Sequence, residues 1–119
     1  MKKWFVLGAC VFVAGCAAQS EEALNVTLQP SVEEVAVWEP ITFDVTVETF
    51  GEMEQQAIVE IEILNEAEQT IGILPASHVQ DGRYTLETVL DVAGDYEVIS
   101  HVTVDEHHSM PSTTITVVE

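Results

Sequence analysis

The sequence predicts an all-β protein, a Greek-key β-sandwich of about seven strands. From residue 24 onward, apolar and polar residues alternate with a period of two, which is typical of strands that bury one face. Turn signals built from Gly, Pro and Asp-Gly separate these segments at regular spacing. No segment places apolar residues at the spacing of a helix, so residues 24–119 are expected to form one domain of strands and turns.

The first half of this domain contains four expected strands. Two of them stop at a proline, Pro30 or Pro40, whose nitrogen cannot donate to a sheet. The clearest strand alternates Ile41, Phe43, Val45 and Val47 with polar residues, and a Gly-containing loop follows it. The expected strands of this half are residues 24–28, 35–39, 41–48 and 57–64.

The second half contains four more expected strands and the strongest turn signals. Asp81-Gly82 predicts a tight turn before the strand that begins near Tyr84. Gly94-Asp95-Tyr96 resembles the tyrosine corner of immunoglobulin-like sandwiches, in which a tyrosine hydroxyl bonds to the backbone at a sheet crossing. The predicted sandwich is therefore immunoglobulin-like. The expected strands of this half are residues 70–74, 84–90, 96–104 and 113–118.

The N-terminus has the pattern of a bacterial lipoprotein signal. Lys2 and Lys3 precede an apolar run at 4–14, which is shorter than the roughly 20 residues that a membrane-spanning helix needs. Val13-Ala-Gly-Cys16 resembles a lipobox, so residues 1–15 are expected to be removed and Cys16 to be lipidated. Residues 16–23 would then tether the domain to the extracytoplasmic face of the cell membrane. The alternative is an ordinary signal peptide cleaved near Ala18.

Charge and cysteine content exclude several classes of function. The chain has 21 acidic and three basic residues, and Arg83 is the only cation outside the predicted signal. Such a surface repels nucleic acid and anionic lipid head groups. The carboxylates are scattered without a calcium-loop motif, which favours an acidic coat over a calcium site. Cys10 and Cys16 lie in the signal and at the lipidation site, so no thiol remains for a disulfide, a zinc site or a nucleophile, and no enzyme is expected.

Histidine and methionine side chains are concentrated near the end of the chain. The strand from Tyr96 is expected to bury its even-numbered residues, whereas the last strand is expected to bury the odd-numbered Ile115 and Val117. Residues that pair across two antiparallel strands share a face, so an even-numbered residue must pair with an odd-numbered one. The numbers of each pair therefore add up to an odd total. A turn centred on residues 106 and 107 meets this condition. It pairs Asp105 with His108 and Thr103 with Met110, and it places His101 on the diagonal from Met110. The pattern therefore predicts that His101, His108 and Met110 share the outward face, while His107 points elsewhere.

Two imidazoles and a thioether form a ligand set that favours copper. Thioether sulfur suits Cu(I) and imidazole suits copper in either oxidation state, whereas zinc sites rarely use methionine. The alternative is that His101, His108 and Met110 are ordinary exposed residues without a ligand.

The chain also resembles the YtkA-like family of small secreted bacterial proteins. The resemblance rests on His101-Val-Thr followed by His108-x-Met110-Pro111, and it covers the chain from about Leu24 to its end. Two further motifs support it: Ala76-Ser-His78 before Asp-Gly-x-Tyr84, and Glu39-Pro40-Ile-Thr-Phe43. The resemblance implies an immunoglobulin-like fold and a part in copper handling or in the assembly of respiratory copper centres.

The resemblance implies a ligand set as well as a fold. It points to His78, His101, His108 and Met110, with His107 as a copper-capable donor where a methionine is expected. Ile73 stands where a methionine is common, and Met53 could replace it only from a loop at the same end of the sandwich.

Two functions remain open at this stage. The first is a membrane-anchored, extracytoplasmic copper-binding lipoprotein that buffers copper or delivers it to a respiratory oxidase assembly partner. The second is a metal-free, immunoglobulin-like interaction module on a lipid anchor.

Overall fold

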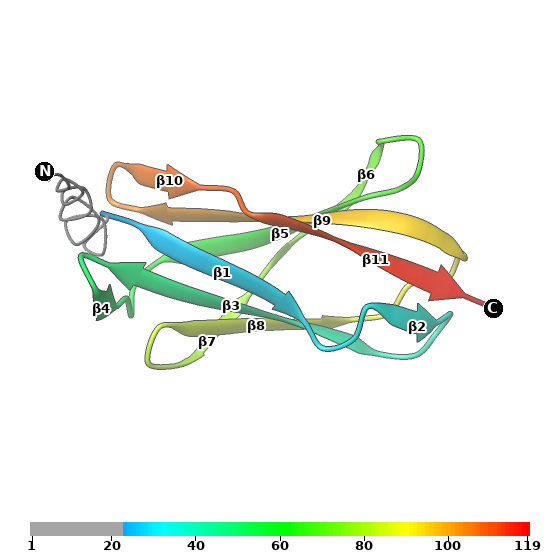
Figure 1. The fold of residues 1–119 in the computed structure, drawn as a ribbon, viewed down its shortest axis with the longest axis horizontal. Coiled ribbons are helices and arrows are strands. Elements are labelled where there is room, and N and C mark those ends of the chain that lie inside the picture. Colours follow the sequence, from blue (N-terminus) through cyan, green and yellow to red (C-terminus); the bar gives the residue numbers. More distant parts are fainter. Residues whose placement is uncertain (1–22) are drawn as a thin grey trace, which may run out of the picture.

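The computed structural model describes residues 23–119 and consists of two β-sheets packed face to face (Figure 1). The predicted signal, the lipidation of Cys16 and most of the tether lie outside the described residues. Among the described residues, no helix has the length and hydropathy needed to cross a bilayer.

The first sheet has five strands in the order β1-β3-β8-β7, with β4 paired to β3. All pairings within it are antiparallel. Its strands are β1 (Asn25–Pro30), β3 (Ile41–Thr49), β4 (Glu52–Met53), β7 (Ser77–Gln80) and β8 (Arg83–Thr88).

The second sheet has six strands in the order β2-β11-β9-β5-β6, with β10 paired to β9. The chain passes from one sheet to the other after β1, β2, β4, β6 and β8, and β2 runs parallel to β11. The strands of the second sheet are β2 (Glu34–Ala36), β5 (Ile58–Leu64), β6 (Thr70–Pro75), β9 (Gly94–Val104), β10 (His107–Ser109) and β11 (Ser112–Val118).

This topology confirms the predicted immunoglobulin-like sandwich. The order β1-β3-β8-β7 facing β11-β9-β5 corresponds to the ABED and GFC sheets of that fold. Seven of the eleven described strands make up these two sets, and the other four are β2, β4, β6 and β10, of which all but β6 have only two or three residues.

The core lies between the sheets and follows the period-two pattern of the sequence. In β3, Ile41, Phe43, Val45 and Val47 are all buried, and the residues between them are half-buried on the other face. Full burial of each such side chain contributes about 1.5–3 kcal/mol, so the two inward faces supply most of the driving force for packing the sheets. The rest of the buried apolar core is Val35, Val59, Ile61, Ile63, Tyr84, Leu90, Tyr96, Val98, Val102, Val104, Ile115 and Val117.

The tyrosine corner is present where the sequence predicts it. Tyr96 is buried at the start of β9, and its hydroxyl donates to the backbone oxygen of Val92. Burial raises the pKa of Tyr96, and the nearby charges of Asp91 and Glu66 raise it further. This contact fixes the segment that leads from β8 into β9.

The Asp81-Gly82 turn is also present, between β7 and β8. Both residues have positive φ angles, 40° and 74°, as a tight hairpin turn of this kind requires. The Gly82 carbonyl accepts a hydrogen bond from the Val47 amide at 2.8 Å, which holds the turn against β3. A Cβ atom at Gly82 would lie 2.7 Å from the Val47 backbone oxygen, so the site has no room for a side chain.

Candidate metal centre

The hairpin of β9 and β10 has a different register from the one the sequence predicts. His107 pairs with Val104 and His108 pairs with Thr103, so the turn is centred on residues 105 and 106. The predicted pairing of Asp105 with His108 and of Thr103 with Met110 is therefore wrong by two residues. The physical reason lies in the turn, because Asp105 adopts a φ of 53° that Asp tolerates well and closes a two-residue loop.

The predicted facing of these side chains is nevertheless confirmed, because a shift of two residues preserves the face. Val102 and Val104 are buried, whereas His101 and Thr103 face outward and His108 and Met110 are exposed.

Pro111 does not disturb the register between β9 and the end of the chain. The pairs before it, such as Thr103 with His108, and after it, such as Ile99 with Ser112, follow one register. The Ser100 amide donates to the Pro111 oxygen at 2.8 Å and bridges the gap between them. Continuing this register places Met110 opposite His101 rather than on its diagonal.

His101 and His108 form a pair of imidazoles on the outer face of the six-stranded sheet. Their ring centroids lie 6.0 Å apart, with 50° between the ring planes. Nitrogen-to-metal bonds in zinc sites are about 2.0–2.1 Å, and the ring centre lies about 1 Å beyond the nitrogen, so two imidazoles on one ion can have centres up to about 6 Å apart. The observed separation lies within reach of one ion between the rings.

Each ring uses one nitrogen in a contact with the protein. His101 Nε2 lies 2.7 Å from Glu62 Oε1, and His108 Nδ1 lies 3.0 Å from Thr103 Oγ1. Within residues 23–119, His101 Nδ1 and His108 Nε2 have no hydrogen-bonding partner and remain available as ligands. Metal-binding histidines typically use their second nitrogen to contact a carboxylate or another oxygen, so this arrangement fits a metal ion.

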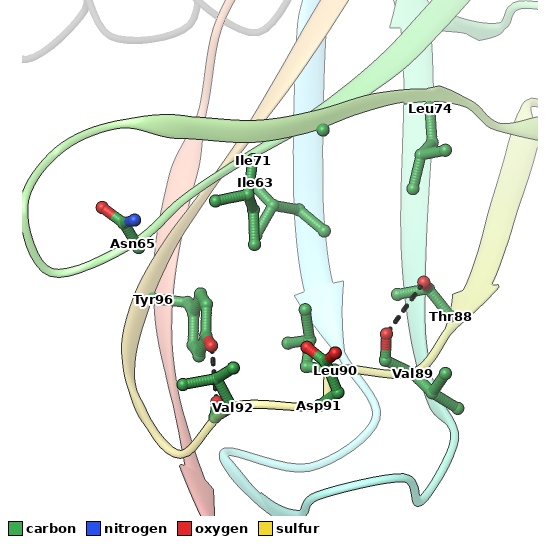
Figure 2. Close-up of a pocket in the computed structure, with 11 residues that line it drawn as sticks. Ile63, Asn65, Ile71, Leu74, Thr88, Val89, Leu90, Asp91, Val92 and Tyr96 are labelled. Atoms are coloured by element: carbon green, nitrogen blue, oxygen red, sulfur yellow. Dashed lines mark hydrogen bonds between the residues drawn. The ribbon is translucent and has the colours of Figure 1, made fainter.

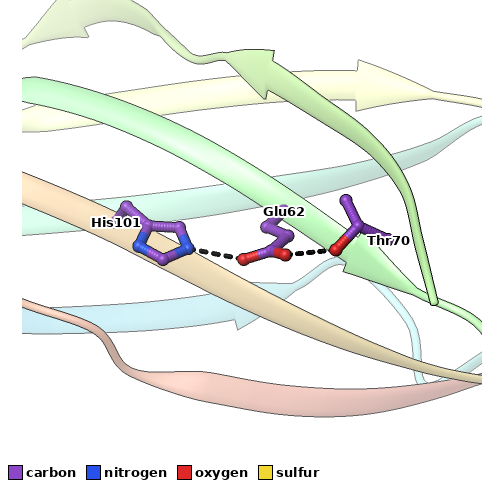
Figure 3. A network of polar contacts seen from close by, with 3 residues as sticks. All are labelled: Glu62, Thr70 and His101. Atoms are coloured by element: carbon purple, nitrogen blue, oxygen red, sulfur yellow. Dashed lines mark hydrogen bonds and ion pairs between the residues drawn. The ribbon is translucent and has the colours of Figure 1, made fainter. Parts of the chain in front are cut away.

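Glu62 is the site residue that the sequence did not reveal. It lies on β5, and its carboxylate contacts Thr70 on β6 as well as His101 (Figure 3). The hydrogen bond from Thr70 lowers the pKa of Glu62, and the contact with His101 lowers it further. Glu62 therefore stays ionised and orients the His101 ring. In the sequence, the alternation of residues 57–64 indicates only that Glu62 faces outward. Its contact with His101 depends on the pairing of β5 with β9, which the sequence does not show.

The other two histidines lie elsewhere. His107 is opposite Val104 and faces the space between the sheets, and its ring meets the edge of Phe50 at a centroid distance of 6.3 Å. His78 lies on β7 in the other sheet, where Nε2 is 2.8 Å from Gln55 Oε1 and the ring packs 5.1 Å from that of Tyr84. The structure does not bring either ring into contact with His101 or His108.

Met53 lies on β4, also in the five-stranded sheet. The contact between Phe50 and His107 shows that the turn between β3 and β4 reaches the same end of the sandwich as β10. Across the described residues 23–119, no three His, Cys, Asp or Glu side chains gather closely enough to hold a metal ion. Met110, which the continued register places opposite His101, is the remaining candidate for a third protein ligand.

No protein-family model and no curated protein matches the chain, so the resemblance to the YtkA-like family stays a prediction. Solved structures do share its fold. CopC from Methylosinus trichosporium OB3b has a TM-score of 0.57 at 19% identity, over 79% of this chain and 94% of CopC. The PmoD soluble domain from Methylocystis sp. ATCC 49242 (Rockwell) has a TM-score of 0.52 at 15% identity, over 79% and 90%. The Lin-41 filamin domain has a TM-score of 0.57 at 13% identity, over 82% and 93%.

Two larger proteins contain a region with the same fold. The chain spans 20% of an engineered protein, at a TM-score of 0.64, and 31% of the alkylpurine DNA glycosylase AlkC from Pseudomonas fluorescens, at a TM-score of 0.58. These likenesses, at 14–15% identity, show a shared fold, and a fold does not assign an activity.

Proposed function

We propose that this protein is an extracytoplasmic, lipid-anchored copper-binding protein whose ion is held by His101, His108 and Met110. The observation that carries the proposal is the pair of imidazoles 6.0 Å apart on one exposed sheet face. Glu62 behind His101 and Thr103 behind His108 would orient the rings.

The donor set favours copper over zinc or calcium. Two neutral imidazoles and a thioether are the ligands that Cu(I) prefers, whereas calcium requires several oxygen ligands. A site on an open sheet face, with Met110 56% exposed, allows ligand exchange with a partner. The many carboxylates of the chain would raise the local concentration of cations. These features suit copper buffering or delivery to a respiratory oxidase assembly partner.

The test is a titration of the soluble domain, residues 17–119, with Cu(I) and Cu(II) against a competing chelator. The proposal expects one tight equivalent that is lost when His101 and Met110 are both replaced by Ala. A matched control replaces His78 and Met53, which are the same residue types on the other sheet, and should retain the equivalent. Weak binding that scales with the number of carboxylates and survives the first double substitution would contradict the proposal.

A second set of variants separates the roles within the site. Glu62→Gln should weaken copper affinity by about 10–100-fold, as is typical when the partner of a metal-binding histidine is removed. Met110→Leu should weaken Cu(I) binding more than Cu(II) binding, because thioether sulfur is a soft ligand.

A metal-free interaction module is the second candidate. It is favoured by the edge of β6, which within residues 23–119 pairs with β5 alone and can accept an added strand from a partner. This function predicts a partner protein whose crosslinking to the domain is the same with copper and with a copper chelator.

A further inference from the structure

A hollow of about 440 Å³ opens on the side of the sandwich between β6 and the segment 88–92 (Figure 2). Its base is aliphatic, formed by Ile63, Leu74 and Leu90. Apolar side chains also stand at its rim with much of their surface in water: Ile71 is 49% exposed and Val92 is 61% exposed. The volume falls within the range of about 300–1,000 Å³ that is typical of ligand-binding pockets.

The hollow exists because both sheets end there without a further strand. In the six-stranded sheet, β6 pairs only with β5. In the five-stranded sheet, β7 pairs with β8 only as far as Thr85, so within residues 23–119 the segment 86–88 has a partner on one side alone. Two strand edges with unpaired backbone groups therefore border the aliphatic base. Such edges can pair with an added extended segment.

The surroundings of the hollow are acidic. Asp91 lines it, and a second hollow of about 190 Å³ shares Asn65, Val92 and Tyr96 with it and adds Glu66 and Asp95. The Glu66 carboxylate accepts a hydrogen bond from the Asp95 amide at 3.0 Å.

No cation of the described residues neutralises this acidic region. Arg83, the only Lys or Arg among residues 23–119, lies 3.5 Å from Asp44 on the five-stranded sheet. The raised pKa of Tyr96 agrees with a negative potential at this place, since Asp91 and Glu66 contribute to it after burial.

The two hollows and the strand edges beside them form one groove. We propose that this groove binds an extended peptide segment of a partner protein. The segment would place an apolar side chain in the larger hollow and a Lys or Arg side chain against Asp91, Glu66 and Asp95, and its backbone would pair with a free strand edge. Charge argues against the other occupants. A second copy of a chain with net charge −18 and an anionic lipid surface are both repelled.

The test is a titration of ¹⁵N-labelled residues 17–119, which contain both sheets and the whole core, with the peptide acetyl-Lys-Leu-Val-Lys-amide. Amide shifts should be confined to residues 65–66, to β6 and to residues 86–96, and the affinity should fall as salt is added. Two comparison peptides, acetyl-Glu-Leu-Val-Glu-amide and acetyl-Lys-Ser-Ser-Lys-amide, lack the charge or the apolar side chains and should not produce these shifts.

Two variants with matched controls test the contacts. Val92→Ser removes apolar surface at the rim and should weaken binding about three- to tenfold, while Val79→Ser, at a similarly exposed valine on β7, should leave it unchanged. Asp91→Asn should weaken binding about two- to fivefold, while Asp105→Asn in the β9–β10 turn should not.

Three results would overturn the proposal. One is equal binding of the Lys-Ser-Ser-Lys peptide, which would mean attraction by charge alone. Another is the absence of localised shifts at millimolar peptide. The third is a dimer in sedimentation that Val92→Ser dissociates, which would mean that a second copy occupies the groove.

Discussion

Ser100 offers a direct test of how the core of this sandwich is built. It lies on the inward face of β9 between Val98 and Val102, opposite Ile61 of β5, and it is fully buried. Among residues 23–119, Ser100 is the one polar residue that is buried in the core. Its Oγ has no hydrogen-bonding partner among these residues. Ser100→Ala removes this oxygen and leaves the rest of the packing in place.

The expected result is a gain in stability. A buried hydroxyl without a hydrogen bond costs about 1–3 kcal/mol relative to water. Removing a single oxygen leaves only a small void, which offsets part of that gain. We expect the free energy of unfolding to rise by about 1 kcal/mol and the Tm to rise by about 4–8 °C, as for other domains of this size.

The assay is urea and thermal unfolding of residues 17–119, followed by far-UV circular dichroism. The control is Ser112→Ala at an exposed position of β11, which should change stability by less than about 0.5 kcal/mol. A loss of about 1 kcal/mol or more in Ser100→Ala would refute the reasoning, because it would mean that the hydroxyl makes a hydrogen bond in solution.

Two further predictions concern the turns and the imidazole site. Gly82→Ala should lower the free energy of unfolding by at least about 1 kcal/mol more than Gly51→Ala. Both glycines have positive φ, but only at Gly82 would the added Cβ clash with a backbone oxygen of β3. Equal losses of stability in urea unfolding would contradict this prediction. Glu62 has a lowered pKa in the folded state, so its contacts with Thr70 and His101 contribute stability above the unfolded carboxyl pKa of about 4.3, and this is lost as pH falls through the folded value. As pH falls below about 5, the free energy of unfolding in urea should therefore decrease less for Glu62→Gln than for the unchanged protein. If it decreases equally in both proteins, the Glu62 carboxylate does not stabilise the fold through these contacts.

The two proposed sites use different parts of the same scaffold. The residues proposed to bind copper lie on the outer face of the six-stranded sheet, at the hairpin of β9 and β10, whereas the hollow proposed to bind a peptide lies beside the edge strand β6 (strands in Figure 1). Copper affinity and peptide affinity should therefore respond to different substitutions.

The sequence by itself determined the class of fold and the faces of the strands. Alternation with a period of two reports which face is buried, and the requirement that paired strands bury the same face holds in any allowed register. For this reason His101, His108 and Met110 were correctly placed on the outward face even though the predicted turn was wrong by two residues. The Gly-x-Tyr signal of the corner at Tyr96 was equally local, and the structure confirms its hydrogen bond.

Only the tertiary structure decided which strands are neighbours, and with that the composition of each site. Glu62 is 39 residues from His101 in the chain and meets it because β5 lies beside β9. His78 and Met53 belong to the opposite sheet, and the groove beside β6 exists because β7 stops pairing at Thr85. Periodicity describes one strand at a time, whereas these contacts depend on the order of strands in two sheets, which is set by the packing of the whole core.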